Sequence, residues 1–165
     1  MRFTYEIAAH PTRYDGVLFH SRLEARWAAF FDLSGWMWQY EPIDLKSWTP
    51  DFYVKFNCGH SECTGYHDLY VEVKPFRSIE EFKGHPAYEL FYDYGRTFNY
   101  KISAVALFGA GPEFTYWEMS HGAGGGSEEV KNWVNNAYNQ LPDKSCTVDE
   151  LWKEAGNLVQ YQGRR

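Results

Sequence analysis

Four charged side chains in this sequence could form one catalytic site. Glu72 and Lys74 lie in the segment DLYVEVKP, residues 68–75, where the two-residue period of a strand places both on one face, ~7 Å apart. Asp51 follows a proline at the start of another predicted strand, and Glu24 lies on a predicted helix. Carboxylate oxygens are the ligands that Mg²⁺ requires, so Asp51 and Glu72 could hold this ion. Lys74 could then position an attacking water or stabilise charge developing on a phosphate.

Each of these residues also has a structural explanation. Glu72 and Lys74 could be a solvated pair on a strand, and Asp51 could simply begin one. Glu24 stands three residues after Ser21, which is the spacing of a helix capping box. The occurrence of all four residues at matching positions on these predicted elements nevertheless favours a catalytic site over a set of solvated surface charges.

The elements that must position these residues are a helix and three strands. Hydrophobic residues at helical spacing predict a helix over residues 21–35, ended by Ser34-Gly35. Aromatic and β-branched content predicts strands at 36–42, 49–56 and 68–75.

The remaining segments complete a mixed α/β fold. The expected elements are a helix from Ser78 to Gly95, interrupted near His85-Pro86, a hairpin of strands 101–109 and 114–120, and helices at 128–140 and 148–160. The glycine-rich segment 121–127 is the expected connector. We therefore expect a core over residues 1–120 with one central mixed sheet flanked by helices, and a helical C-terminal extension of the same domain over 128–165.

The pattern FHSRLEARWAAFFDLSGWMWQYEP…WTPDFYV…LYVEVKP resembles the PD-(D/E)xK nuclease superfamily. The matching residues are Pro50-Asp51 and Glu72-Val73-Lys74, with Glu24 in the helix before them, and the resemblance covers roughly residues 14–76. The Glu-x-Lys motif alone is common by chance. Its combination with Pro-Asp and an upstream Ser-Arg-Leu-Glu is fairly specific.

The resemblance implies a restriction-endonuclease-like fold and metal-dependent hydrolysis of DNA phosphodiester bonds. Asp51 and Glu72 would be Mg²⁺ ligands, with Mn²⁺ as a substitute, Lys74 would position the water, and Glu24 would complete or support the metal shell. The chain is similar to small phage and bacterial endonucleases, including Holliday-junction resolvases. Transposon end-cutting nuclease subunits share a similar layout. A junction-cutting enzyme would suit a homodimer, because symmetric cuts need two sites.

A separate metal site is conceivable in the loop between the second and third strands. Four residues in the segment CGHSECTGYH are ligands that zinc accepts: Cys58, His60, Cys63 and His67. Their spacing is not that of a standard zinc knuckle. A polar loop with free thiols is the alternative.

Three further side chains are weaker candidates. Arg22 and Arg26 lie one helical turn apart and could face phosphate, although a solvated helix face explains them as well. Glu41, next to Tyr40 at the end of the first strand, could be another acidic ligand.

Composition limits the functional classes. The net charge of −6 argues against a protein that coats nucleic acid, but not against an enzyme with a local groove. Three cysteines, with no signal peptide and no membrane span in the sequence, predict a protein of the cytoplasm, which would be that of the bacterial host for a phage protein. The acidity and the aromatic content would also suit a second function: a nuclease-fold binding or assembly subunit of a phage or mobile-element complex.

Overall fold

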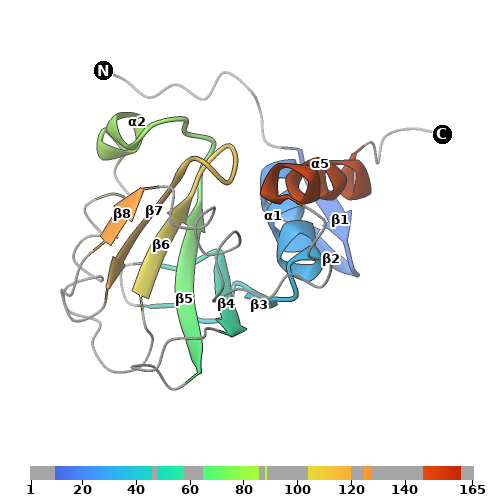
Figure 1. The fold of residues 1–165 in the computed structure, drawn as a ribbon, viewed down its shortest axis with the longest axis horizontal. Coiled ribbons are helices and arrows are strands. Elements are labelled where there is room, and N and C mark those ends of the chain that lie inside the picture. The colour runs from blue at the N-terminus through green and yellow to red at the C-terminus, as the bar shows by residue number, and fades with distance from the viewer. Residues whose placement is uncertain are drawn as a thin grey trace.

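The computed structural model describes residues 10–45, 48–57, 65–85, 88, 104–119, 125–127 and 147–160. Over these residues the chain is a mixed α/β structure, with a twisted sheet on one side and α1 and α5 stacked at its flank (Figure 1). The helices are α1 (Arg22–Leu33), α2 (Ile79–Lys83) and α5 (Val148–Val159). The strands are β1 (Thr12–Tyr14), β2 (Val17–Phe19), β3 (Met37–Tyr40), β4 (Phe52–Asn57), β5 (Tyr66–Val73), β6 (Ala104–Phe108), β7 (Thr115–Met119) and β8 (Gly125–Ser127).

The central sheet has the strand order β3-β4-β5-β6-β7-β8. Its only parallel pair among the described strands is β5 with β6, and the other neighbours run antiparallel. A separate hairpin, β1-β2, turns through Asp15 and Gly16, whose φ angles of 49° and 77° fit the two-residue turn that matches strand twist. The expectation of one central mixed sheet flanked by helices is confirmed at this level.

Helix α1 forms where its sequence signals predict it. Ser21 caps its N-terminus by accepting a hydrogen bond from the backbone N–H of Glu24. The helix ends at Ser34, and Gly35 then takes a φ of 77°, a left-handed conformation that glycine adopts readily. The inward face consists of aromatic and small residues.

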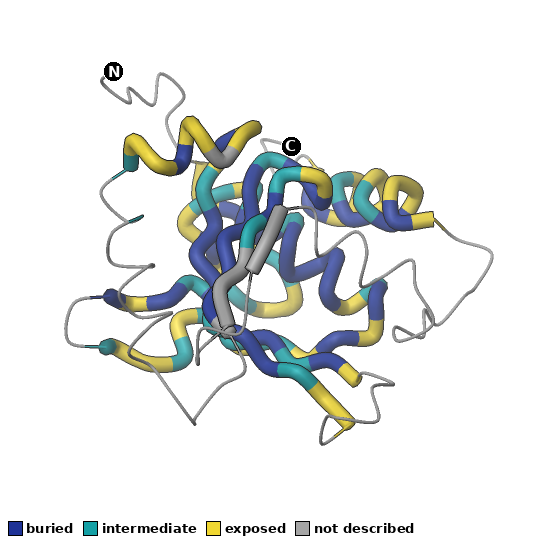
Figure 2. The backbone as a smooth tube through the Cα atoms, turned by 60° about the vertical axis from the view of Figure 1, so that its left-hand side comes forward, coloured by how far each residue is buried: buried dark blue, intermediate teal, exposed yellow. Residues whose placement is uncertain are grey.

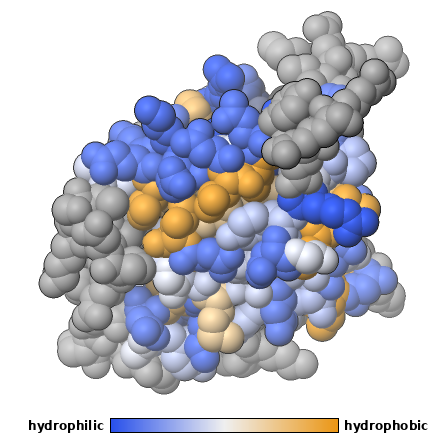
Figure 3. All heavy atoms as spheres, turned by 90° about the vertical axis from the view of Figure 1, so that its right-hand side faces the viewer, coloured by the Kyte–Doolittle hydropathy of each residue, from blue (hydrophilic) through white to orange (hydrophobic). Residues whose placement is uncertain are grey.

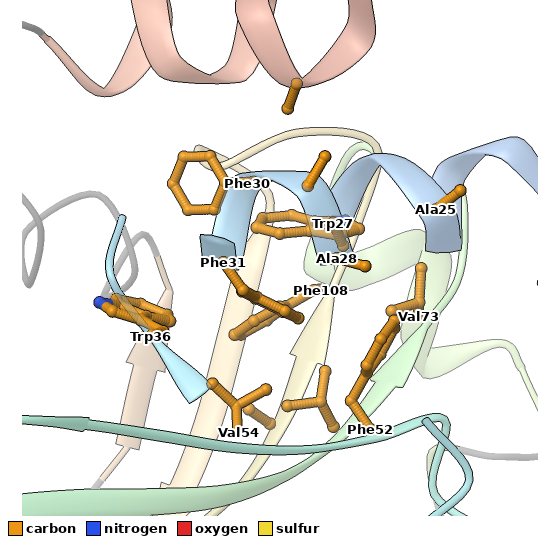
Figure 4. Packing of buried hydrophobic residues seen from close by; sticks show 14 of the residues in the cluster. Ala25, Trp27, Ala28, Phe30, Phe31, Trp36, Phe52, Val54, Val73 and Phe108 are labelled. Atoms are coloured by element: carbon orange, nitrogen blue, oxygen red, sulfur yellow. The ribbon is translucent and has the colours of Figure 1, made fainter. Parts of the chain in front are cut away.

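The main core lies between α1 and the sheet. Figure 4 shows Trp27 and Phe31 of α1 directed toward Phe108, with Val54 and Phe52 of β4 beneath them. All five side chains are essentially inaccessible to solvent. Burying a side chain of this size typically stabilises a fold by ~1.5–3 kcal/mol, so this cluster fixes α1 on the sheet.

Helix α5, at the position of the helix predicted over residues 148–160, packs against α1. Leu151, Ala155 and Val159 are buried, and Trp152 lies 4.6 Å from Trp27 between ring centroids. Its cap is Thr147, which accepts from the N–H of Glu150. Helix α1 is therefore held between the sheet and α5.

The opposite face of the sheet carries a second, smaller cluster. It consists of Trp48, Phe76, Phe82, Val105 and Leu107. Both faces of β5 are thus covered, and Figure 2 shows the buried segments gathered in the middle of the molecule. Glu72 is buried on this second face, among hydrophobic neighbours.

Some predicted elements differ from the structure. The glycine-rich segment 121–127 is not a connector throughout, because Gly125–Ser127 pairs with β7 as strand β8. The helix predicted from Ser78 with a break near His85-Pro86 is, by contrast, confirmed over the described residues: α2 ends at Gly84, and Tyr88 is helical again. The strand predicted at 49–56 begins at Phe52, so Asp51 precedes it. The predicted helix at 128–140 lies outside the described residues.

Hydrophobic side chains also reach the surface. Figure 3 shows several of them between polar residues on the side of the molecule where α5 and the β1-β2 hairpin lie. Leu18 of β2 and Leu158 of α5 are 52% and 47% exposed. None of the helices in the described ranges has the length and hydrophobicity to cross a lipid bilayer.

Candidate active site

Four element ends meet at one end of the sheet. Tyr40 at the end of β3 pairs with Phe52 at the start of β4, and Phe52 pairs with Val71 near the end of β5. The N-terminus of α1 lies beside them, because Tyr40 contacts Glu24 in its first turn. This arrangement places charged residues from separate segments in one region.

Asp51 is bound to β5 through its side chain. Its Oδ2 accepts a hydrogen bond of 2.8 Å from the backbone N–H of Val73. The pKa of Asp51 is raised to about 8, first by burial and then by the charges of Glu72 and Glu24, against the lowering effect of the Val73 N–H and Lys74. Asp51 is therefore a buried carboxyl group with two other carboxylates close enough to act on it.

Glu72 is buried and held by two neighbours. Its Oε2 accepts a hydrogen bond of 2.8 Å from the indole Nε1 of Trp48. Its Oε1 lies 3.1 Å from the Nζ of Lys74. The side chain of Lys74 is 30% exposed, so it connects the buried carboxylate with the solvent.

Glu24 is held at the start of α1 by two hydroxyl groups. The Ser21 hydroxyl donates to its Oε1 at 2.9 Å, and the Tyr40 hydroxyl donates to its Oε2 at 2.7 Å. Burial raises the pKa of Tyr40, and the hydrogen bond to Glu24 adds to this effect, so Tyr40 remains a hydrogen-bond donor. Of the capping box predicted for Glu24, the structure has the hydrogen bond from the Glu24 N–H to the Ser21 hydroxyl oxygen, while the Glu24 carboxylate binds the hydroxyl groups of Ser21 and Tyr40.

The structure brings the four predicted residues to the same end of the sheet. Glu72 contacts Lys74 directly, and Glu72 and Glu24 both act on the pKa of Asp51. Within the described part of the chain, however, no three His, Cys, Asp or Glu side chains form a ready-made metal-binding group. The carboxylates thus lie within electrostatic range of one another without converging on a single point.

The chemistry of these donors fits a hard divalent cation. All three acidic side chains offer carboxylate oxygen, the ligand type of Mg²⁺. Burial is the main cause of the raised pKa of Asp51, and the carboxylates of Glu72 and Glu24 add to it; a bound cation would offset both effects. Asp51 and Glu72 are the residues that would hold the ion, with Glu24 beside them.

Sequence patterns did not reveal two aromatic neighbours of this site. Trp48 lies in the loop between β3 and β4, yet it holds Glu72. His85 lies within electrostatic range of Lys74 and Glu72, and burial lowers its pKa, with Lys74 lowering it and Glu72 raising it. Neither residue belongs to a periodic sequence pattern. The only feature that could have indicated a role was the presence of a large apolar residue, Trp48, in a polar loop.

The weaker candidates have different surroundings. The guanidinium of Arg26 donates to the carbonyl of Trp152 at 3.0 and 2.8 Å and stacks on the Trp152 ring. The hypothesis that Arg26 faces phosphate is therefore wrong, because α5 occupies this group. Arg22 is exposed. The carboxylate of Glu41 contacts the imidazole of His20.

Of the four suggested zinc ligands, only His67 lies in the part of the chain that the structure describes. Cys58, His60 and Cys63 lie outside the described residues. His67 lies in β5, with its ring 5.8 Å from that of Phe56 between centroids.

Comparison with known proteins gives no relative. No protein-family model matches the chain, and neither a curated protein nor a solved structure is significantly similar to it.

Proposed function

We propose that this protein is a metal-dependent endonuclease of the PD-(D/E)xK type that hydrolyses DNA phosphodiester bonds. One observation carries the proposal: Asp51 and the Glu72-Val73-Lys74 motif come from separate segments of the chain and lie at one end of the sheet. Glu24 lies beside them on α1. A structural protein has little use for buried carboxylates that repel one another, since ionised groups of like charge destabilise a fold.

The residues divide into distinct roles. Bound Mg²⁺ would supply charge stabilisation for the phosphate and activate the nucleophile. Asp51 and Glu72 bind the ion, and Glu24 supports its shell from the side of α1. Lys74 positions the attacking water and stabilises charge that develops on the phosphate. Trp48 and Tyr40 hold Glu72 and Glu24 through the hydrogen bonds described above.

The arrangement of elements supports a restriction-endonuclease-like core. Asp51 immediately precedes β4, and Glu72 lies on the antiparallel neighbour β5. Strand β6 extends the sheet in parallel to β5, and α1 covers one face. A parallel pair requires a crossover connection, which in this chain leaves β5 next to Lys74 and passes through α2. Fold analogy of this kind raises the expectation for DNA as the substrate without identifying its form.

The experiment compares matched substitutions on defined DNA substrates. Wild-type protein and the variants Asp51→Asn, Glu72→Gln and Lys74→Ala are assayed on linear duplex and four-way-junction DNA with Mg²⁺ or Mn²⁺. Lys83→Ala and Glu154→Gln are the controls, because both side chains are exposed and neither has a contact with Asp51, Glu72 or Lys74 among the interactions described. Calorimetric titration with Mn²⁺ measures the metal affinity of each protein independently of cleavage.

The expected result is metal-dependent cleavage by wild-type protein and by both controls. Asp51→Asn and Glu72→Gln should weaken Mn²⁺ binding, and Lys74→Ala should abolish cleavage while it retains the metal. Wild-type protein that behaves like Lys74→Ala on every substrate would contradict the proposal. If the protein in that case still binds DNA, the result would favour the function of an assembly subunit. Separately, sedimentation of the protein with junction DNA would show whether it acts as a homodimer.

A further inference from the structure

A histidine and a glutamate form a pair at the rim of this acidic region. His20 immediately precedes the N-cap of α1, and Glu41 immediately follows β3. The imidazole Nε2 of His20 lies 2.6 Å from Oε1 of Glu41. The two side chains are 74% and 43% exposed, so a substrate can reach them from solvent.

The backbone holds Glu41 in a conformation that few residues adopt. Its φ is 47°, in the left-handed region, and the following Pro42 restricts this residue further. The N–H of Glu41 donates to the carbonyl of Asp51 at 2.8 Å, which ties it to the candidate metal ligand. Strained non-glycine residues of this kind gather at functional sites, where the surrounding structure maintains them.

Tyr40 connects the pair to the carboxylates. Its hydroxyl accepts a hydrogen bond of 3.1 Å from the backbone N–H of His20 and donates one of 2.7 Å to Glu24. One phenolic oxygen thus separates the His20 backbone from the Glu24 carboxylate. The ring of His20 also lies against that of Tyr40, at 5.9 Å between centroids. The imidazole is consequently placed beside the acidic site by its contacts with Tyr40 and Glu41, at the end of β3.

We propose that His20 is the general acid that protonates the leaving oxygen, and that Glu41 positions it. The attacking water forms a bond to phosphorus and releases its proton to solvent. The bond between phosphorus and the bridging oxygen breaks, the electron pair stays on that oxygen, and the imidazolium donates its proton there. Solvent then returns a proton to His20. His20 would thus serve the leaving oxygen, whereas Lys74, which contacts Glu72, serves the attacking water. The assignment rests on the proposed nuclease function.

The test uses a leaving group that needs no proton. The bridging oxygen that leaves is identified from the product ends of wild-type cleavage, and a second substrate carries sulfur at that position. A thiol has a pKa of about 8.5, so the thiolate departs without protonation. Rates are measured with Mn²⁺ on both substrates for wild type, His20→Asn, Glu41→Gln and the control His10→Asn. His10 is exposed and contacts Thr12 through its backbone carbonyl.

His20→Asn should lower the rate on the oxygen substrate by about 100-fold, the usual size of general-acid catalysis, and leave the rate on the sulfur substrate near that of wild type. Glu41→Gln should show the same selectivity with a smaller loss, and His10→Asn should match wild type on both. An equal loss on both substrates, or none, would overturn the assignment. Wild-type protein that cleaves neither substrate would instead remove the nuclease function, and this inference with it.

Discussion

At the scale of single residues, Asp51 combines burial with a strong negative environment. Its pKa is raised to about 8 from the ordinary value of 3.8. Between these pH values the folded protein retains a proton that the unfolded chain has lost. The free energy of unfolding therefore falls as the pH rises through this window, and the stabilisation present at acid pH is lost by about pH 8.

Asp51→Asn should remove this pH dependence. The amide keeps an oxygen for the Val73 N–H but cannot ionise, so the variant should be more stable than wild type at pH 8 by an amount on the order of a few kcal/mol. Thermal unfolding without divalent metal, followed from pH 4 to 8, measures the effect. Asp149→Asn, at an exposed position of α5, is the control and should follow the wild-type curve. Parallel curves for Asp51→Asn and wild type would contradict the raised pKa.

Tyr40 should contribute to function more than to stability. Tyr40→Phe removes the hydroxyl that donates to Glu24 and accepts from His20. We expect about 1 kcal/mol of destabilisation and a loss of about 10-fold in cleavage rate, because groups that orient metal-site carboxylates typically have effects of this size. Tyr53→Phe is the matched control, since its hydroxyl donates to Asp68 at 3.0 Å. It should cost similar stability and leave cleavage unchanged; equal cleavage losses would show that Tyr40 has no special role.

At the scale of elements, the N-termini of α1 and α5 offer a comparison. Ser21 and Thr147 both accept a hydrogen bond from the N–H three residues later, at 3.1 Å in each case. Ser21 alone of the two caps also donates to a candidate metal-site carboxylate, that of Glu24. The cap of α1 is therefore also part of the candidate site, whereas the hydrogen bond described for Thr147 caps its own helix.

Ser21→Ala and Thr147→Ala should each lower the free energy of unfolding by about 1 kcal/mol, the usual cost of losing a cap. Only Ser21→Ala should also weaken Mn²⁺ binding, because it frees Oε1 of Glu24. Chemical denaturation and calorimetric titration measure the two effects. Equal Mn²⁺ affinities in the two variants would show that the Ser21 hydroxyl does not orient Glu24.

Local patterns predicted the elements that carry the site, but not the contacts between them. Helix α1 follows from its cap and its hydrophobic spacing, and β5 follows from the alternation around Glu72, both of which are short-range signals. The contact of Arg26 with Trp152 joins residues 126 positions apart, and no short-range pattern could have removed Arg26 from the phosphate candidates. Strand β8 consists of two glycines and a serine, whose pairing uses only backbone groups and leaves no pattern.

At the scale of the whole molecule, three parts of the fold meet at Gly109. Its N–H donates to the carbonyl of Phe114 in the β6-β7 turn, and its carbonyl accepts from the indole of Trp27 on α1. The carbonyl of Phe76, in the segment after Lys74, binds the neighbouring N–H of Ala110. This point therefore ties the site-bearing end of β5 to α1 and to the far half of the sheet.

Gly109→Ala should disrupt this junction. A Cβ there would lie 2.6 Å from the carbonyl oxygens of both Phe114 and Phe76, backbone atoms that cannot move aside without shifting their segments. We expect a loss of about 2 kcal/mol or more in the free energy of unfolding, as is usual for overpacking, together with reduced cleavage because the displaced Phe76 follows Lys74 closely. Gly84→Ala is the control, since its Cβ would meet only the Glu81 carbonyl at an ordinary 3.6 Å. Thermal unfolding of the two variants decides the outcome. Similar melting temperatures would contradict the prediction, because they would mean that the backbone around Gly109 shifts at little cost. In that case α1 and the segment after Lys74 would not be rigidly coupled through Gly109.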